Sequence, residues 1–291
     1  MRAFSSMRPL IHRITPPIIL EAVRAVRARI RSGVNVATEW EYIAEGWAYA
    51  QTHPEVLGWN VVDILEVYKA KWPHFVAMLE GQQPLGFSHE STLANREEIN
   101  SHNTIMIFAY GLTLASRQLQ TISMLDWGGG IGHYYLFSRA ILPEVSINYY
   151  CKDVQILAEY GKELFPEQHF FFTDDCLDFQ YDFVLASGSL HFSESWEEIF
   201  IGLARATRGY FLLTRLPVVQ NTQSFVFIQR PYAYGYRTEY LGWCLNRSDI
   251  LHLAEESNLE LVREFVIGER PGIVNAPEQC QYRGFLFKAK T

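Results

Sequence analysis

The sequence has little cysteine, no surplus of basic charge and no long hydrophobic run, and each shortage excludes a class of protein. Its net charge of −7 argues against a partner held through a phosphate backbone, so we expect no nucleic-acid partner. No apolar run approaches the ~20 residues that span a bilayer, and the first residues lack a signal peptide's apolar stretch; we expect no membrane insertion and a cytoplasmic location. The cysteines lack the close spacing of a zinc site, so we predict no metal and reduced, buried thiols at Cys151, Cys176, Cys244 and Cys280.

Residues 17–120 show helical spacing of apolar side chains and almost no strand pattern. We therefore predict an α-helical N-terminal cap over residues 1–120, whose apolar faces are compatible with a homodimer. One helix carries four arginines, which leaves open a membrane-surface role or an ordinary solvated face. The expected helices are Pro17–Arg31, Glu39–Gln51, Val61–Glu80 (broken at Pro73) and Asn95–Leu119.

From Thr121 onward, short apolar runs alternate with segments of helix length, a pattern typical of an α/β domain with a parallel sheet. We predict a Rossmann-like sheet of seven strands over residues 121–291. The last two strands have no room for a helix between them, so the final strand should be antiparallel. The expected strands are 121–126, 146–152, 169–173, 181–186, 209–214, 259–267 and 282–289, with helices at 133–142, 154–165, 195–207 and 247–257.

A glycine-rich turn joins the first strand to the helix that begins near His133. Glycine allows positive φ and lets a ligand approach the backbone N–H groups, while the helix N-terminus favours negative charge. A glycine cluster alone is also compatible with a dinucleotide site or a plain tight loop. The glycines are Gly128, Gly129, Gly130 and Gly132.

Acidic residues follow the carboxyl ends of three successive strands, at one edge of the sheet, where ligands bind in open α/β folds. Asp126 precedes the glycines. Asp153, beside Val154, closes the second strand, where a carboxylate can bind both ribose hydroxyls. Asp174 or Asp175 follows the third strand and is placed to bind an adenine amino group. Any one of these acids is equally compatible with a helix cap or a solvated loop.

Two details favour S-adenosylmethionine over a dinucleotide as the cofactor. His133 stands where the dinucleotide fingerprint needs its third glycine, and Asp126 begins the methyltransferase pattern D-x-G-x-G-x-G, in which it faces the methionine end. After the fourth strand, Ser187 begins a segment expected near the transferred methyl, without the motifs of nucleobase methyltransferases. His191 in this segment is a candidate general base or merely a capping residue, and His102 and His133 are weaker candidates.

From Trp40 to Lys290 the sequence resembles a little-characterised family of bacterial class I methyltransferases, often encoded among surface-polysaccharide and natural-product genes. The resemblance implies the class I methyltransferase sheet and its cofactor, but no acceptor. It rests on Leu125–Tyr135, Thr214–Pro217, Gln223–Tyr236 and Leu241–Arg247.

An aromatic insert at residues 217–245, after the fifth strand, is expected to close over the active site or to pack as a lid on the N-terminal helices. Its aromatic rings suit a sulfonium and its arginines suit an acceptor anion. The predicted acceptor-binding residues are Arg215, Arg230, Tyr236, Arg237 and Trp243.

The sequence therefore predicts methyl transfer from S-adenosylmethionine to a small molecule, catalysed by alignment and exclusion of water. Because bases are few, an amino-acid-like thioether or amine is favoured, for example methionine S-methylation. Alternatives are O-methylation of a sugar or natural-product hydroxyl with His191 as base, a nicotinamide or nucleotide-sugar enzyme, and a catalytically silent binding protein of this fold.

Overall fold

The computed structural model describes residues 38–86 and 99–290, and the elements below belong to one unit, Glu39–Thr291. The predicted helix Pro17–Arg31 lies outside the described residues. In the described part of the chain, no helix is long and apolar enough to cross a membrane.

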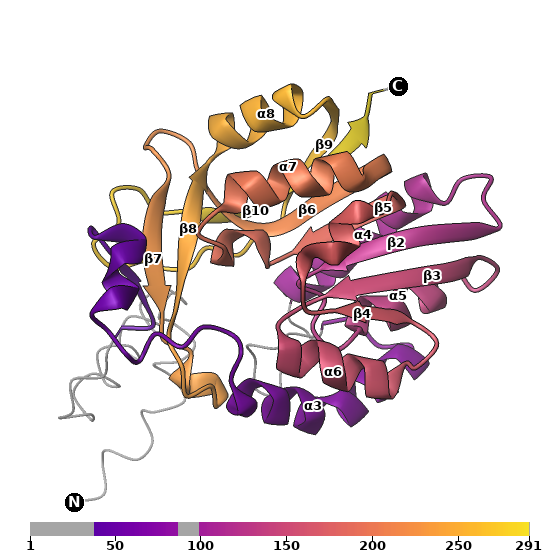
Figure 1. Cartoon of the computed structure of the whole chain (residues 1–291), viewed down its shortest axis with the longest axis horizontal. Helices are drawn as coiled ribbons and strands as arrows, with labels where there is room; N and C mark the ends of the chain where they lie inside the picture. The colour runs from indigo at the N-terminus through magenta and orange to yellow at the C-terminus, as the bar shows by residue number, and fades with distance from the viewer. Residues whose placement is uncertain (1–37, 87–98, 291) are drawn as a thin grey trace, which may run out of the picture. The chain divides into compact units, whose positions relative to one another are not determined.

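All seven predicted strands are present (Figure 1). Their order in the sheet is β4-β3-β2-β5-β6-β10-β9, with β10 antiparallel to both of its neighbours and the first five strands parallel. This order, with a reversed strand inserted beside β6, is that of the class I methyltransferase sheet, so the predicted fold is confirmed. The strands are β2 (Thr121–Trp127), β3 (Ser146–Lys152), β4 (His169–Phe171), β5 (Tyr181–Ser187), β6 (Thr207–Val219), β9 (Leu259–Val266) and β10 (Gln281–Ala289).

Three further strands extend the sheet and correct two predictions. The aromatic insert forms a hairpin of β7 (Phe225–Gln229) and β8 (Tyr240–Asn246), not an irregular loop, and β8 continues the sheet beside Val218 and Val219 of β6. β1 (Trp40–Tyr42) pairs with β7 where a helix was predicted. Only a short 3-10 helix, Gly46–Gln51, follows it.

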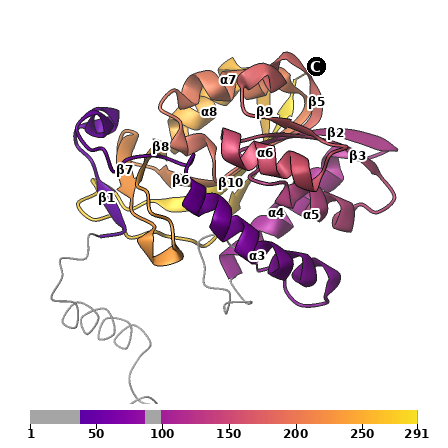
Figure 2. The same ribbon diagram turned by 60° about the horizontal axis from the view of Figure 1, so that its bottom comes forward.

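Helices cover both faces of the sheet because each has an apolar side (Figure 2). α4 and α5 pack on one face around Phe108, Leu112 and Phe137. α7 and α8 pack on the other around Phe200 and Ile250. The helices are α3 (Val62–Glu80), α4 (Ile99–Ala115), α5 (His133–Ile141), α6 (Gln155–Leu164), α7 (Trp196–Ala206) and α8 (Arg247–Glu256).

The predicted break at Pro73 does not occur, and α3 continues through it. Proline removes one helical hydrogen bond, but residues on both sides of it are held by packing. Tyr68 lies in a cluster with Ile131 and Leu157, and Phe75 lies in the main core. α3 thereby lies beside α6 near the carboxyl ends of β2 and β3 (Figure 1).

Candidate functional site

The glycine turn after β2 takes a shape that only glycine fits. Gly128 has φ +75°, and a Cβ there would lie 2.1 Å from the Cβ of Ser189. Its N–H donates to the carbonyl of Lys152 at 2.7 Å, which ties the turn to β3. The hydroxyl of Ser189 donates to the Trp127 carbonyl at 2.6 Å, which ties the turn to the segment after β5. The turn is therefore fixed between two neighbouring strands.

Asp153 lies directly after β3 and joins this turn. Its two carboxylate oxygens accept hydrogen bonds from the backbone N–H groups of Gly130 and Val154, both at 2.7 Å. Burial raises the pKa of Asp153, against the lowering effect of these two N–H groups. Because each carboxylate oxygen has more than one lone pair, the group can still accept bonds from a ligand in the cavity that it lines.

Asp126 does not face the cavity, contrary to the sequence-based expectation. Its side chain is fully buried beneath the turn, where a Cβ on Gly129 would lie 2.4 Å from Oδ2. Oδ2 accepts a hydrogen bond from the Tyr149 hydroxyl at 2.6 Å, and Oδ1 has no hydrogen-bond partner among the described residues. Burial raises the pKa of Asp126 to about 7. In this geometry Asp126 contacts the turn from beneath and does not line the cavity.

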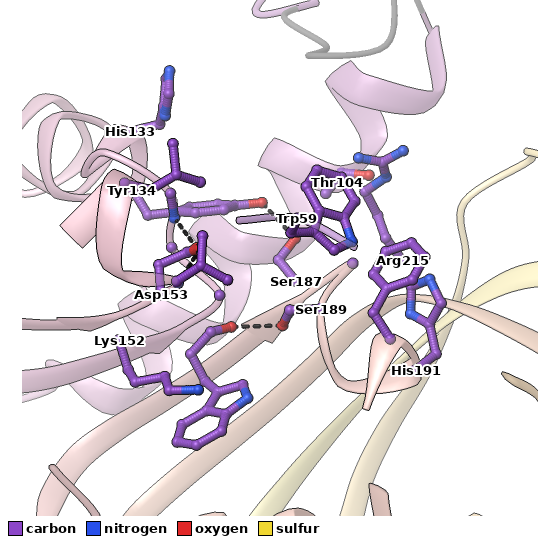
Figure 3. A pocket seen from close by; sticks show the side chains of 18 of the residues that line it. Trp59, Thr104, His133, Tyr134, Lys152, Asp153, Ser187, Ser189, His191 and Arg215 are labelled. Carbon is purple, nitrogen blue, oxygen red and sulfur yellow. Dashed lines mark hydrogen bonds between the residues drawn. The ribbon is translucent and has the colours of Figure 1, made fainter. Parts of the chain in front are cut away.

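A cavity of about 230 Å³ opens at the carboxyl ends of β2, β3, β5 and β6. One end, which we call the cofactor end, is formed by the turn glycines 128–130, Asp153, Val154 and Lys152. The other, which we call the acceptor end, is formed by Trp59, Thr104, His191, Arg215 and Tyr282. Figure 3 shows Asp153 and Tyr134 on one side and Trp59, Arg215 and His191 on the other, with Ser187 between them.

Tyr134 and Ser187 meet between the two ends. Their hydroxyl oxygens are 2.7 Å apart. Burial raises the pKa of Tyr134 to about 12, so its hydroxyl keeps its proton at neutral pH. The pair places two hydroxyls, one from the start of α5 and one from the end of β5, in the middle of the cavity wall.

Arg215 is held in a strained backbone conformation at the acceptor end. It has φ +49°, and the pairing of β6 with β10 shifts register here, between Arg283 and Phe285. Such a bulge re-aims a side chain, and strain of this kind is concentrated at functional sites. The guanidinium lies 3.6 Å from Glu269 and 5.8 Å from the ring of Tyr282.

Neither histidine of the cavity is suited to act as a base at neutral pH. Burial and nearby Arg215 lower the pKa of His191 to about 3, and burial lowers that of His133 to about 3. His133 is packed against aromatic rings of α3, including Trp72 at 5.0 Å. His102 does not line the cavity.

Besides Gly128, Asp153 and Asp126, seven residues were predicted to bind the cofactor; four of them line the cavity and three do not. Gly129, Gly130, Val154 and Ser187 are among its walls. Gly132 is the left-handed residue before α5 and faces Phe165 instead. Asp174 and Asp175 are exposed and lie outside the cavity; Asp174 pairs with Lys152 at 3.5 Å and Asp175 accepts from Thr173 at 2.7 Å. Of these three, Gly132 contacts the cavity residue Gly129 through its N–H, and Asp174 contacts the cavity residue Lys152, whereas Asp175 bonds to Thr173 outside the wall.

Of the five predicted acceptor residues, only Arg215 lines the cavity. Arg230 is engaged instead by Glu41 at 2.8 Å and Glu239 at 3.4 Å, which joins β1 to the hairpin. Arg237 is exposed and lies 3.9 Å from Asp63. The two aromatic residues also lie elsewhere: Tyr236 is buried in the α3 cluster, and Trp243 donates to the carbonyl of Glu194 at 3.2 Å.

The hairpin nevertheless supports the acceptor end from outside. Tyr240 of β8 stacks on Trp59 with ring centroids 4.5 Å apart and contacts Phe192 at 5.0 Å. Trp59 and Phe192 line the cavity and are 5.1 Å apart. The aromatic residues of the insert therefore lie behind the cavity wall and not over the cavity, and Tyr236 packs with Ile64 and Leu65 of α3, in the manner of the alternative lid on the N-terminal helices.

Several wall residues were not predicted from the sequence. Trp59, Thr104 and Tyr282 come from three segments far apart in the chain, and no local motif marks them. Tyr134 follows the glycine turn directly, and its position at the start of a helix above that turn was the available signal.

No protein-family model and no curated protein matches the chain. Solved structures similar in fold include a putative sarcosine dimethylglycine methyltransferase from Galdieria sulphuraria, 14% identical, covering 74% of this chain and 97% of that one with a TM-score of 0.46. An S-adenosylmethionine-dependent methyltransferase from Clostridium acetobutylicum is 10% identical over 64% and 92% of the two chains, with a TM-score of 0.43. The 1,6-didemethyltoxoflavin-N1-methyltransferase of Burkholderia thailandensis, with bound S-adenosylhomocysteine, is 11% identical over 81% and 94%, with a TM-score of 0.44. At such values the fold assignment rests on the strand order of the sheet.

Proposed function

We propose that this protein is a methyltransferase that uses S-adenosylmethionine and acts on a small molecule. The proposal rests on one observation: the glycine turn and Asp153 line the same cavity, at the carboxyl edge of a class I methyltransferase sheet. A carboxylate beside exposed backbone at this edge fits the ribose of a nucleoside cofactor. The resemblance to the bacterial gene-cluster family remains a prediction.

The cavity residues fit S-adenosylmethionine as follows. Asp153 would bind the ribose hydroxyls, and Gly128 to Gly130 would allow the methionine part to lie against the backbone without a Cβ in the way. The cofactor supplies an electrophilic methyl group. The protein aligns the acceptor and excludes water, effects that can contribute about 7–11 kcal/mol when the geometry is good.

The acceptor that the site supports best is a small amino-acid-like thioether or amine. These acceptors carry a free lone pair when uncharged, whereas a hydroxyl must lose its proton during transfer. With the pKa of His191 and His133 both lowered to about 3, neither imidazole is matched to that task near neutral pH. This disfavours O-methylation with His191 as base. Of the acceptor-binding residues predicted from the sequence, Arg215 is the one that lines the cavity.

The N-terminal region contributes directly to the cavity. Trp59 and Tyr68 come from or next to α3, and Thr104 comes from α4. The division into a helical cap, residues 1–120, and a catalytic domain, residues 121–291, with the insert 217–245, remains a prediction; residues 39–120 belong to one compact unit with the rest of the described chain. A cytoplasmic location and a homodimer remain predictions from the sequence.

The direct test is calorimetry with S-adenosylhomocysteine on the wild type, Asp153→Asn and the control Asp178→Asn, which changes an exposed acid outside the cavity. We expect binding by the wild type and the control, and at least a tenfold weaker affinity in Asp153→Asn, about 1.4 kcal/mol or more. Absence of binding contradicts the proposal. Binding without turnover on any amino acid, thioether, amine or sugar supports the silent binding protein instead.

A further inference from the structure

The polar groups at the acceptor end are dominated by hydrogen-bond donors. Arg215 brings a guanidinium, Trp59 an indole N–H, and His191 a neutral imidazole that has one N–H to give. Two aromatic rings, Phe192 and Tyr282, each lie next to two of these three residues. Phe192 lies 4.0 Å from His191 and 5.1 Å from Trp59, and Tyr282 lies 6.4 Å from His191 and 5.8 Å from the Arg215 guanidinium.

Two of these donors are buried without a hydrogen bond. Nε1 of Trp59 and both ring nitrogens of His191 have no hydrogen-bond partner within residues 38–86 and 99–290, and His191 is only 1% exposed. A buried donor left unpaired costs about 1–3 kcal/mol. Unpaired donors that line a cavity therefore indicate a ligand that brings acceptor atoms to them.

The charge of the wall indicates the kind of acceptor atoms. The only carboxylate among the described residues that line the cavity is Asp153, at the cofactor end. Glu269 pairs with Arg215 but is not a wall residue. The acceptor end thus presents a guanidinium to the cavity, paired from outside the wall by Glu269, and no wall carboxylate that could bind an ammonium group. A guanidinium with two further N–H donors suits a carboxylate, which has two acceptor oxygens.

We propose that Arg215, Trp59 and His191 form a binding site for a carboxylate carried by the methyl acceptor, whose apolar part packs against Phe192 and Tyr282. This inference rests on the proposed methyltransferase function. His191 acts here as a neutral donor, not as a base. The pairing of Arg215 with Glu269 and the stacking of Trp59 on Tyr240 hold both side chains in place before the acceptor binds.

The test compares acids with their primary amides on protein saturated with S-adenosylhomocysteine. The probes are acetate and acetamide, 3-(methylthio)propanoate and its amide, and benzoate and benzamide, each titrated by calorimetry. The variants are Arg215→Gln and Trp59→Phe, which keeps an aromatic ring and removes the N–H. The control is Arg263→Gln, an exposed arginine of β9 outside the cavity.

We expect at least one acid to bind tenfold more tightly than its amide in the wild type and the control. The preference should disappear in Arg215→Gln and fall about threefold in Trp59→Phe, since each loses donors to the carboxylate. No preference in any pair, or a preference that survives Arg215→Gln, overturns the inference while S-adenosylhomocysteine binding still supports the proposed function. If Arg215→Gln instead weakens S-adenosylhomocysteine binding tenfold, Arg215 binds the cofactor's own carboxylate and the acceptor assignment is wrong.

Discussion

The two ends of the cavity are built in opposite ways. The cofactor end is formed mainly by backbone groups and one carboxylate from a single stretch of chain, residues 126–154. The acceptor end is formed by side chains from five separate segments, which contribute Trp59, Thr104, His191, Arg215 and Tyr282. A backbone site depends on chain geometry, whereas a side-chain site depends on which residues surround it. We therefore expect substitutions at the first end to abolish cofactor binding and substitutions at the second to alter acceptor choice.

The largest effect should come from Gly128→Ala, which breaks the cofactor end alone. Positive φ costs a residue with a Cβ about 1–2 kcal/mol, and overpacking against Ser189 adds about 1–3 kcal/mol. The turn must leave its binding shape, so affinity for S-adenosylhomocysteine should fall about a thousandfold, or about 4 kcal/mol by calorimetry.

Gly58→Ala is the matched control for this substitution. Gly58 has a similar φ of +70°, but nothing lies within 4 Å of the Cβ that alanine would add. It should lose about 1 kcal/mol of stability and keep its affinity for S-adenosylhomocysteine. An equal loss of affinity in both variants would mean that the contact with Ser189 is irrelevant.

The contrast between the two ends also explains what the sequence could predict. The glycines, Asp153 and Val154 are close in sequence, and the chain direction of β2 and β3 brings them together without knowledge of any other contact. Asp126 belongs to the same motif, yet its burial beneath Gly129 depends on Tyr149 of the next strand. The motif alone therefore could not predict which way the Asp126 side chain points.

The acceptor end required the tertiary structure. Arg215 faces the cavity because of a bulge between β6 and β10, whose register no local pattern gives. The hairpin was missed although Phe225–Gln229 is a short apolar run, because every residue of β7 is buried and the alternation of a half-exposed strand is absent. β1 has three residues and exists by pairing with β7. Both errors concern strands that are stabilised by pairing with other strands and have no clear strand pattern of their own.

The second largest effect should come from Arg230→Gln, which damages the hairpin without touching the cavity. Glu239 is 6% exposed. In this variant its carboxylate would keep the hydrogen bond from the Tyr232 hydroxyl but lose its ion pair with Arg230. Breaking a buried ion pair costs several kcal/mol, and we expect a loss of about 3 kcal/mol in urea unfolding. The matched variant is Arg237→Gln, whose side chain is 87% exposed. It should change stability by less than about 0.5 kcal/mol; similar losses in both would contradict the structural role of Arg230.

A third prediction concerns the charge beneath the turn. The folded-state pKa of Asp126 is about 7, against an ordinary value of 3.8, so the folded protein favours the protonated acid. Stability from this group is present below the ordinary value and is lost as pH rises from about 4 to about 7. Between about pH 5 and about pH 7.5, the wild type should lose about 2 kcal/mol relative to Asp126→Asn.

Urea unfolding of both proteins at the two pH values measures this difference. Asp178→Asn, which removes an exposed carboxyl away from the turn, is the control. If Asp126→Asn shows the same pH dependence as the wild type, Asp126 is ionised in the folded protein throughout this range. The geometry of the turn would then need a cation near Asp126 that offsets its burial.

The smallest effect should come from Tyr240→Leu, which tests whether the hairpin holds the acceptor end in place. Its ring stacks on Trp59 at 4.5 Å and contacts Phe192 at 5.0 Å, and an aromatic pair contributes about 0.5–1.5 kcal/mol. Loss of that support should weaken binding of the preferred acid probe about fivefold, or about 1 kcal/mol, and leave S-adenosylhomocysteine affinity unchanged. Phe287→Leu removes an equally buried ring from the core cluster of Phe200 and Phe211, outside the cavity wall. If both variants weaken the probe equally, the effect is general destabilisation; if only Tyr240→Leu does so, the hairpin positions the wall that selects the acceptor.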